Sequence, residues 1–194
     1  MSAAPINLTN QFLIAMPGMS ESAFAGSVIY LCEHNENGAL GLVINKPIDI
    51  TLGNLFEKVE LSLDREDLAT LPVYFGGPVQ TERGFVLHEA PGGDPEASPY
   101  NSSMKIEGGL EMTTSKDVLE AIASGSGPKK MLVTLGYSGW AAGQLEDEMS
   151  RNGWINVGAE RAIIFDTPVE QRYDKALSLL GIDAGTLSAA AGHA

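Results

Sequence analysis

The sequence predicts an α+β protein with a single domain. Two observations favour this fold class: β-rich runs are joined by short turns rich in Gly, Asn and Pro, and other segments combine helix-capping signals with apolar residues at helical spacing. Strands and helices do not alternate regularly, which argues against a parallel βαβ array. The chain has 194 residues, a length at which one domain buries enough surface to fold without a disulfide or a metal.

The first half of the chain is predicted to be mainly β-structure. The runs 27–33 and 40–44 flank Asn37-Gly38, and this dipeptide readily adopts positive φ, so the three features together predict a hairpin. Pro47 is expected to end the second strand because proline lacks a backbone N–H. Thr51 is expected to cap a short helix that extends to residue 59. Further strands are expected at 12–15, 73–75, 84–88, 103–106 and 110–112.

Helices dominate the predictions for the second half. A capping box at 114–117 is expected to open a helix that Gly125 ends, and a second box at 167–170 to open another whose apolar face includes Tyr173 and Leu177. The run 130–135 is predicted to be a buried strand, 136–139 its turn, 140–151 a helix, and 161–165 a strand. The domain is expected to span residues 1–182, with the alanine-rich residues 183–194 as a mobile tail.

Composition excludes several classes of function. The chain carries 12 Lys and Arg against 25 Asp and Glu, a net charge of −13, and this field repels phosphate backbones, so we do not expect direct DNA binding. Its one cysteine allows neither an intrachain disulfide nor a thiolate zinc cluster. The N-terminus has no basic signal-peptide region, and no apolar run is long enough to cross a membrane. We therefore expect a cytoplasmic protein that does not bind membranes.

Two serine motifs invite a catalytic interpretation. Gly136-Tyr137-Ser138-Gly139 resembles a hydrolase nucleophile elbow, but Trp140 occupies the position where that turn needs glycine, so Ser138 is expected to cap a helix. Ser102 and Lys105 have the Ser-x-x-Lys spacing of penicillin-recognising enzymes, but that chemistry needs a helix and this segment is predicted to be a strand. The sequence predicts no catalytic serine.

Cys32 and His34 form the other chemically capable pair. Alternation along a strand places them on one face, where they could act as a thiol–imidazole pair or bind a metal with His88 and a carboxylate. We favour the simpler interpretation, in which Cys32 belongs to the core and His34 lies at the rim of the hairpin. No phosphate-binding glycine loop is present. We expect no cofactor, no metal and no catalytic residue.

Several short segments characterise the chain as a whole. They are FLIAMP (12–17), SVIYLCEHN (27–35), GLVINKP (41–47), GGPV (76–79), RGFVLH (83–88), TTSKDVL (113–119), LGYSGW (135–140), GQLE (143–146) and NGW (152–154). In this order, over about residues 8–182, they resemble the YqgE/AlgH family of bacterial proteins. The resemblance implies an α+β domain with a bent or bifurcated, mostly antiparallel sheet, partly closed like a barrel and surrounded by three to four helices. It also implies the label of an uncharacterised protein or transcriptional regulator.

Two functions follow as expectations. The first is a regulator or adaptor that acts through protein contacts and affects transcription only indirectly, which agrees with the acidic charge and with the regulatory label that the resemblance implies. The alternative is a small-molecule-binding protein or weak hydrolase with a polar cleft near Cys32 and His34. The side chains expected to line that cleft are Cys32, His34, Asn45, Arg83 and His88.

Overall fold

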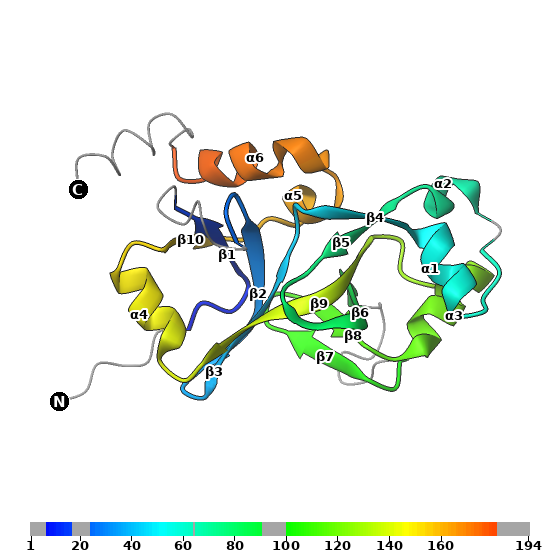
Figure 1. Cartoon of the computed structure of the whole chain (residues 1–194), viewed down its shortest axis with the longest axis horizontal. Helices are drawn as coiled ribbons and strands as arrows, with labels where there is room; N and C mark the ends of the chain where they lie inside the picture. Colours follow the sequence, from blue (N-terminus) through cyan, green and yellow to red (C-terminus); the bar gives the residue numbers. More distant parts are fainter. Residues whose placement is uncertain (1–6, 17–23, 64, 91–99, 182–194) are drawn as a thin grey trace.

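The protein is built on one curled sheet. The computed structural model describes residues 7–16, 24–63, 65–90 and 100–181 (Figure 1). Ten strands in these residues form a mostly antiparallel half-barrel. They are β1 (Gln11–Ala15), β2 (Val28–Asn35), β3 (Gly38–Val43), β4 (Pro47–Thr51), β5 (Pro72–Phe75), β6 (Val79–Glu89), β7 (Ser103–Ile106), β8 (Leu110–Thr113), β9 (Met131–Ala141) and β10 (Trp154–Gly158).

Strand β9 joins the two halves of the sheet. The strand order is β10-β1-β2-β3-β9-β6-β8-β7, and β5 adds a parallel pairing to β9 and an antiparallel one to β4. The end of β9 pairs with β3, whereas its beginning pairs with β5 and β6. Figure 1 shows β9 running as one long strand through the centre of the molecule, between the part with α4 and the part with α1 and α3. The bent, bifurcated α+β sheet is thus confirmed.

Glycines allow the backbone to approach β9 closely where the halves meet. Gly136 has a φ of +79° and Gly77 a φ of +155°. A Cβ on Gly77 would lie 2.1 Å from the carbonyl carbon of Tyr137. Ser138 lies inside β9, fully buried, and its hydroxyl donates to the carbonyl of Gly76 at 3.0 Å. The expectation that Ser138 caps a helix is therefore wrong, because the strand continues through it.

The helices are short and cover both faces of the sheet. They are α1 (Leu52–Lys58), α2 (Glu66–Ala69), α3 (Lys116–Ser124), α4 (Gln144–Ser150), α5 (Arg161–Phe165) and α6 (Arg172–Ser178), with a 3-10 turn at Val169–Gln171. Six α-helices in the described residues exceed the expected three to four, because α2 and α5 are single turns. The capping boxes expected at 114–117 and 167–170 do not form. The N-caps are Ser115 at α3 and Pro168 at the 3-10 turn, and neither position has a side-chain cap hydrogen bond. Thr51 does form one with Asn54 at α1.

Three apolar clusters fill the layers. The first lies inside the half-barrel under α5 and α6, and includes Phe12, Tyr30, Cys32, Leu42, Leu87, Ile164 and Leu177. The second packs α4 on the outer face of one half, and includes Ile29, Leu31, Trp140, Leu145 and Trp154. The third packs α1 and α3 on the outer face of the other half, and includes Leu55, Phe56, Val86, Val118, Ile122 and Val133.

Several predicted elements need correction. The helix expected at 140–151 begins only at Gln144, because β9 extends to Ala141. The strand expected at 161–165 is helix α5, in which Ile163 and Ile164 are both buried. A short apolar run does not distinguish a buried strand from a buried helical turn. Strands β4 and β10 were not expected, and the predicted tail at 183–194 lies outside the described residues.

Candidate functional site

A groove with a largely apolar lining lies between α1 and α3. Its volume is about 220 Å³. Strands β6 and β9 supply Val86, Val133 and Leu135 to its lining, while the helices supply Leu55, Val59 and Leu119. Figure 1 shows α1 and α3 at one end of the molecule, the end away from α4.

Local sequence explains how the two helices present these side chains. Thr51 caps α1, and the spacing of four places Leu55 and Val59 on one face of that helix. In α3, Val118 and Ile122 are buried against the sheet, whereas Leu119 is only half-buried and lines the groove. The apolar face of α3 is thus wider than the stripe that contacts the sheet.

Polar groups occupy one rim of this groove. Glu82 at the start of β6 and Thr114, Ser115 and Lys116 at the start of α3 contribute to its lining. Asp117 accepts hydrogen bonds from the Ser115 hydroxyl and from the backbone N–H of Asn101. Burial alone raises the pKa of Asp117, but these hydrogen bonds outweigh it and leave the pKa below its ordinary value.

A buried polar network lies directly behind this rim. Thr113 lines the groove, and its Oγ1 lies 2.7 Å from Nε2 of His88 and 2.6 Å from the hydroxyl of Ser103. The Nδ1 atom of His88 lies 2.9 Å from the carbonyl oxygen of Glu89, which can only accept. In the neutral imidazole Nδ1 therefore donates, Nε2 accepts from Thr113, and Thr113 accepts from Ser103.

Glu111 lies beside this network on the same face of the sheet. It pairs with His88 on β6 and with Lys105 on β7, so the three side chains share one face. Glu111 is 1% exposed, and within the described residues its Oε2 has no hydrogen-bond partner. The ring of Tyr100 meets that of His88 edge-on at 5.5 Å, and burial, followed by the carboxylates of Asp117 and Glu111, raises the pKa of Tyr100. The network stiffens the wall of the groove, while its imidazole is shielded from solvent.

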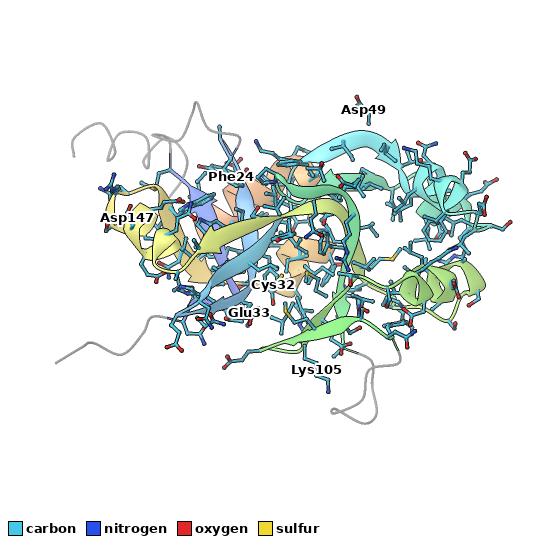
Figure 2. The ribbon with its side chains drawn as sticks, turned by 60° about the horizontal axis from the view of Figure 1, so that its bottom comes forward. Phe24, Cys32, Glu33, Asp49, Lys105 and Asp147 are labelled. Carbon is cyan, nitrogen blue, oxygen red and sulfur yellow. The ribbon has the colours of Figure 1, made fainter. Side chains whose placement is uncertain are left out.

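Cys32 and His34 do not share one face. A bulge shifts the pairing with β3 between Leu31 and Glu33, which reverses the alternation of side chains. Cys32 packs in the interior cluster, and Figure 2 shows it in the middle of the molecule. His34 pairs with Ala39, which packs against the cluster of Trp140 on the other side of the sheet.

The two side chains also have different chemistry. Burial raises the pKa of the Cys32 thiol well above its ordinary range, and the Glu33 carboxylate adds to this rise. The thiol lies 3.8 Å from the carbonyl oxygen of Tyr30. The ring of His34 is occupied at both nitrogens, by the backbone N–H of Leu8 at 3.0 Å and by Glu146 at 2.9 Å. No thiolate–imidazole contact arises from this geometry.

The remaining expected cleft residues lie apart. Asn45 accepts from the backbone N–H of Val28 at 2.8 Å and donates to the carbonyl of Gly26 at 2.9 Å, at the opposite end of β2 from His34. Arg83 is exposed, lies near the Phe85 ring and donates to the Thr114 hydroxyl at 3.3 Å.

Of the five expected residues, only Arg83 and His88 come near the groove. His88 contacts its lining residue Thr113, and Arg83 contacts its rim residue Thr114. The apolar residues that line the groove are not among those predicted from the sequence. One signal could have indicated this lining: Leu119 is an apolar residue next to the stripe of α3 that packs on the sheet, and it is only half-buried.

The described residues have neither a cluster suited to a metal nor a membrane-spanning helix. Residues 7–16, 24–63, 65–90 and 100–181 contain no group of three or more His, Cys, Asp or Glu side chains placed to hold a metal ion. No helix in these ranges has the length and apolar character needed to cross a membrane.

The chain is similar to known bacterial proteins over nearly its whole length. Residues 12–185 match the model of the AlgH-like family, DUF179. A UPF0301 protein of Burkholderia lata is 64% identical over 189 residues, which cover 97% of this chain and 96% of that protein. One from Cupriavidus pinatubonensis is 65% identical over 193 residues, covering 100% and 98%.

Solved structures agree with this assignment. The solution structure of AlgH from Pseudomonas aeruginosa has a TM-score of 0.77 and 46% identity, and the match covers 97% of each chain. A crystal structure of a Corynebacterium diphtheriae protein has a TM-score of 0.72 at 20% identity, over 97% of this chain and 94% of that one, and this likeness concerns the fold alone. The match over most of the chain, the identity to the UPF0301 proteins and the shared half-barrel make this chain a member of the AlgH-like family.

Proposed function

We propose that this chain is a cytoplasmic regulator or adaptor that works by binding a partner protein in the groove between α1 and α3. The observation that carries the proposal is the groove itself. It combines an apolar floor from the sheet, apolar walls from two helices and a polar rim at the start of α3. Such an arrangement suits an apolar anchor side chain with polar contacts around it.

The size of the groove favours the anchor side chain of a protein partner over a drug-sized ligand. At about 220 Å³ it is smaller than the roughly 300–1,000 Å³ of typical small-molecule pockets. That volume suits one or two apolar side chains projecting from a partner surface. Leu119 and Leu55 would then contact the anchor from opposite walls.

Charge favours a basic partner. The net charge of −13 attracts basic surfaces and accelerates encounters with them at low ionic strength. The same charge opposes direct binding to DNA. An effect of this protein on transcription would therefore pass through a second protein.

The alternative function, a small-molecule-binding protein or weak hydrolase around Cys32 and His34, gains no support from the geometry. The two side chains lie on different sides of the sheet, and Asn45 lies at the other end of β2. Catalytic groups must reach each other directly or through one water molecule.

A pair of leucine substitutions tests the groove. Leu119→Glu places a charge on the half-buried groove wall, whereas Leu180→Glu places one on a leucine that is also half-buried but lies just after α6, outside the groove. A partner would first be captured with the wild-type chain from a lysate of its own bacterium, identified and purified. Its affinity would then be measured for all three chains.

We expect Leu119→Glu to weaken binding at least roughly tenfold, as for a central contact residue, and Leu180→Glu to leave it unchanged. Both variants must retain the wild-type circular dichroism spectrum. Equal affinity for Leu119→Glu and the wild type, or the same loss in both variants, would refute binding in this groove.

A further inference from the structure

Arg172 begins helix α6 and is almost fully buried. Its side chain reaches into the junction of α5, α6 and the sheet, and the residue is 6% exposed. Nε donates to the carbonyl of Thr167 at 3.0 Å, and Nη1 donates to the carbonyl of Ile44. The guanidinium also lies over the ring of Tyr74, with its carbon 5.0 Å from the ring centroid.

The charge of this guanidinium is not balanced by a carboxylate. None of the ion pairs among the described residues includes Arg172. Backbone carbonyls accept from Nε and Nη1, whereas no hydrogen bond in this part of the chain uses Nη2. A buried arginine is usually paired, because removing its charge from water is costly.

A small pocket adjoins the same side chain. Its volume is about 80 Å³, and Arg172 is the only charged residue in its lining. Its remaining walls are mostly apolar and include Leu52, Tyr74, Ile164 and Phe165. Leu71, exposed to 41%, also lines it and lies where the pocket meets solvent.

We propose that this pocket binds a carboxylate attached to a short apolar chain, with Nη2 of Arg172 donating to the carboxylate. Arginine suits this role because its planar fork of N–H donors matches carboxylate oxygens, and the apolar walls suit an aliphatic chain. This pocket shares only Val133 with the lining of the groove between α1 and α3, so the proposal goes beyond the proposed function.

The volume limits the ligand. At about 80 Å³ the pocket is several times smaller than the roughly 300–1,000 Å³ of sites that hold drug-sized ligands. That size corresponds to a carboxylate with a chain of a few carbons. A free short-chain acid and the C-terminal residue of a peptide both carry this chemistry.

Thermal unfolding of the full chain with defined probes tests the site. Sodium butyrate is compared with butyramide, which has the same chain without the charge, and with sodium chloride at matched ionic strength. A short peptide ending in leucine is tested with a free and with an amidated C-terminus. We expect butyrate or the free peptide to raise the Tm by about 3–6 °C at roughly ten times its dissociation constant.

The two probes distinguish the sources of the carboxylate. Stabilisation by butyrate alone assigns the pocket to free acids, and stronger stabilisation by the free peptide assigns it to a C-terminus. The proposal is wrong if neither carboxylate raises the Tm above its controls. These controls are butyramide for butyrate, the amidated peptide for the free peptide, and sodium chloride for both.

Substitutions in the pocket provide a second test. Those at Leu71, at the mouth, leave the buried contacts of Arg172 in place, so a loss of binding there does not reflect a loss of folding. Arg172→Lys should abolish the shift, but it also alters the contacts to Ile44 and Thr167. Leu71→Asp places a negative charge at the mouth and should weaken carboxylate binding roughly threefold to tenfold. Leu71→Asn has nearly the same shape without the charge and should bind more tightly than Leu71→Asp. Equal affinity of the two Leu71 variants would contradict the proposal.

Discussion

Nε2 of His34 lies 2.9 Å from Oε1 of Glu146, so the β2–β3 hairpin is tied to helix α4. The two partners differ in burial: the side chain of His34 is 1% exposed, and that of Glu146 is 40% exposed. Nδ1 of the same ring accepts from the backbone N–H of buried Leu8. One imidazole thus holds the segment before β1 as well as α4.

This asymmetry predicts unequal effects of the two partners on stability. His34→Ala should lower the free energy of unfolding by about 1–3 kcal/mol, because the buried N–H of Leu8 loses its acceptor. Glu146→Ala should cost less than about 1 kcal/mol, because water can replace a half-exposed carboxylate. Urea unfolding of both variants measures the difference, and an equal or larger loss in Glu146→Ala would contradict it.

The Cys32 thiol should be inert in the native protein. Burial raises its pKa and so suppresses the reactive thiolate. A disulfide reagent at pH 8 should react with the folded chain only as fast as the chain unfolds. In urea the same reagent should rapidly titrate one thiol per chain, since the sequence has 1 cysteine. Rapid labelling without urea would show that the thiol is accessible.

Asp117 should make stability depend on pH. Its pKa is lowered in the folded chain, so its stabilising contribution is present above the unfolded pKa of about 4 and is lost as pH falls through the lower folded value. Asp117→Asn should therefore be less stable than the wild type at pH 7, by at most about 1 kcal/mol. The gap should narrow below roughly pH 4.

The control for this prediction is Asp49→Asn. Asp49 is exposed on β4 and projects from the molecule in Figure 2. This variant should match the stability of the wild type at both pH values. A gap for Asp117→Asn that widens as pH falls would show that the sign of the pKa shift is wrong.

Gly77 should be the less replaceable of two positive-φ glycines. Its Cβ would overlap the backbone of Tyr137, whereas a Cβ on Gly26, with a φ of +70°, meets no atom within 4 Å. Gly26→Ala should cost about 1–2 kcal/mol for the left-handed backbone. Gly77→Ala should cost about 3 kcal/mol or more, because the turn between β5 and β6 must move away from the backbone of β9. Thermal unfolding of both variants ranks their losses of stability. Similar losses would mean that the backbone of β9 moves away from the added Cβ at little cost in free energy.

Turn and capping residues in the sequence correctly predicted the elements that such residues begin or end. The hairpin around Asn37-Gly38, the Thr51 cap of α1 and the end of α3 at Gly125 are all confirmed. Some elements that depend on distant partners were missed. Strand β10 exists because it pairs with β1, more than a hundred residues earlier in the chain, and no local pattern reveals that pairing.

The candidate site likewise combines features that local sequence reveals with features that depend on distant packing. The sequence identified Arg83 and His88 by residue type, but a bulge in β2 separated Cys32 from His34, and alternation alone does not reveal a bulge. The groove arises from the packing of α1 and α3 on strands distant in sequence. Arg172 was overlooked although it lies three residues after Val169 and four before Ala176, within the apolar stripe of the last helix. A charge at such a position was the available signal for the pocket.

Strand β9 has a consequence for how the protein opens. Because it pairs with β3 at one end and with β5 and β6 at the other, neither half of the sheet can detach without breaking its ladder. The two halves therefore form one cooperative unit. A ligand that binds next to α1 would then stabilise the whole sheet. It should therefore slow hydrogen exchange in the β2–β3 hairpin, at the far end of the molecule, for those amides that exchange only through global opening.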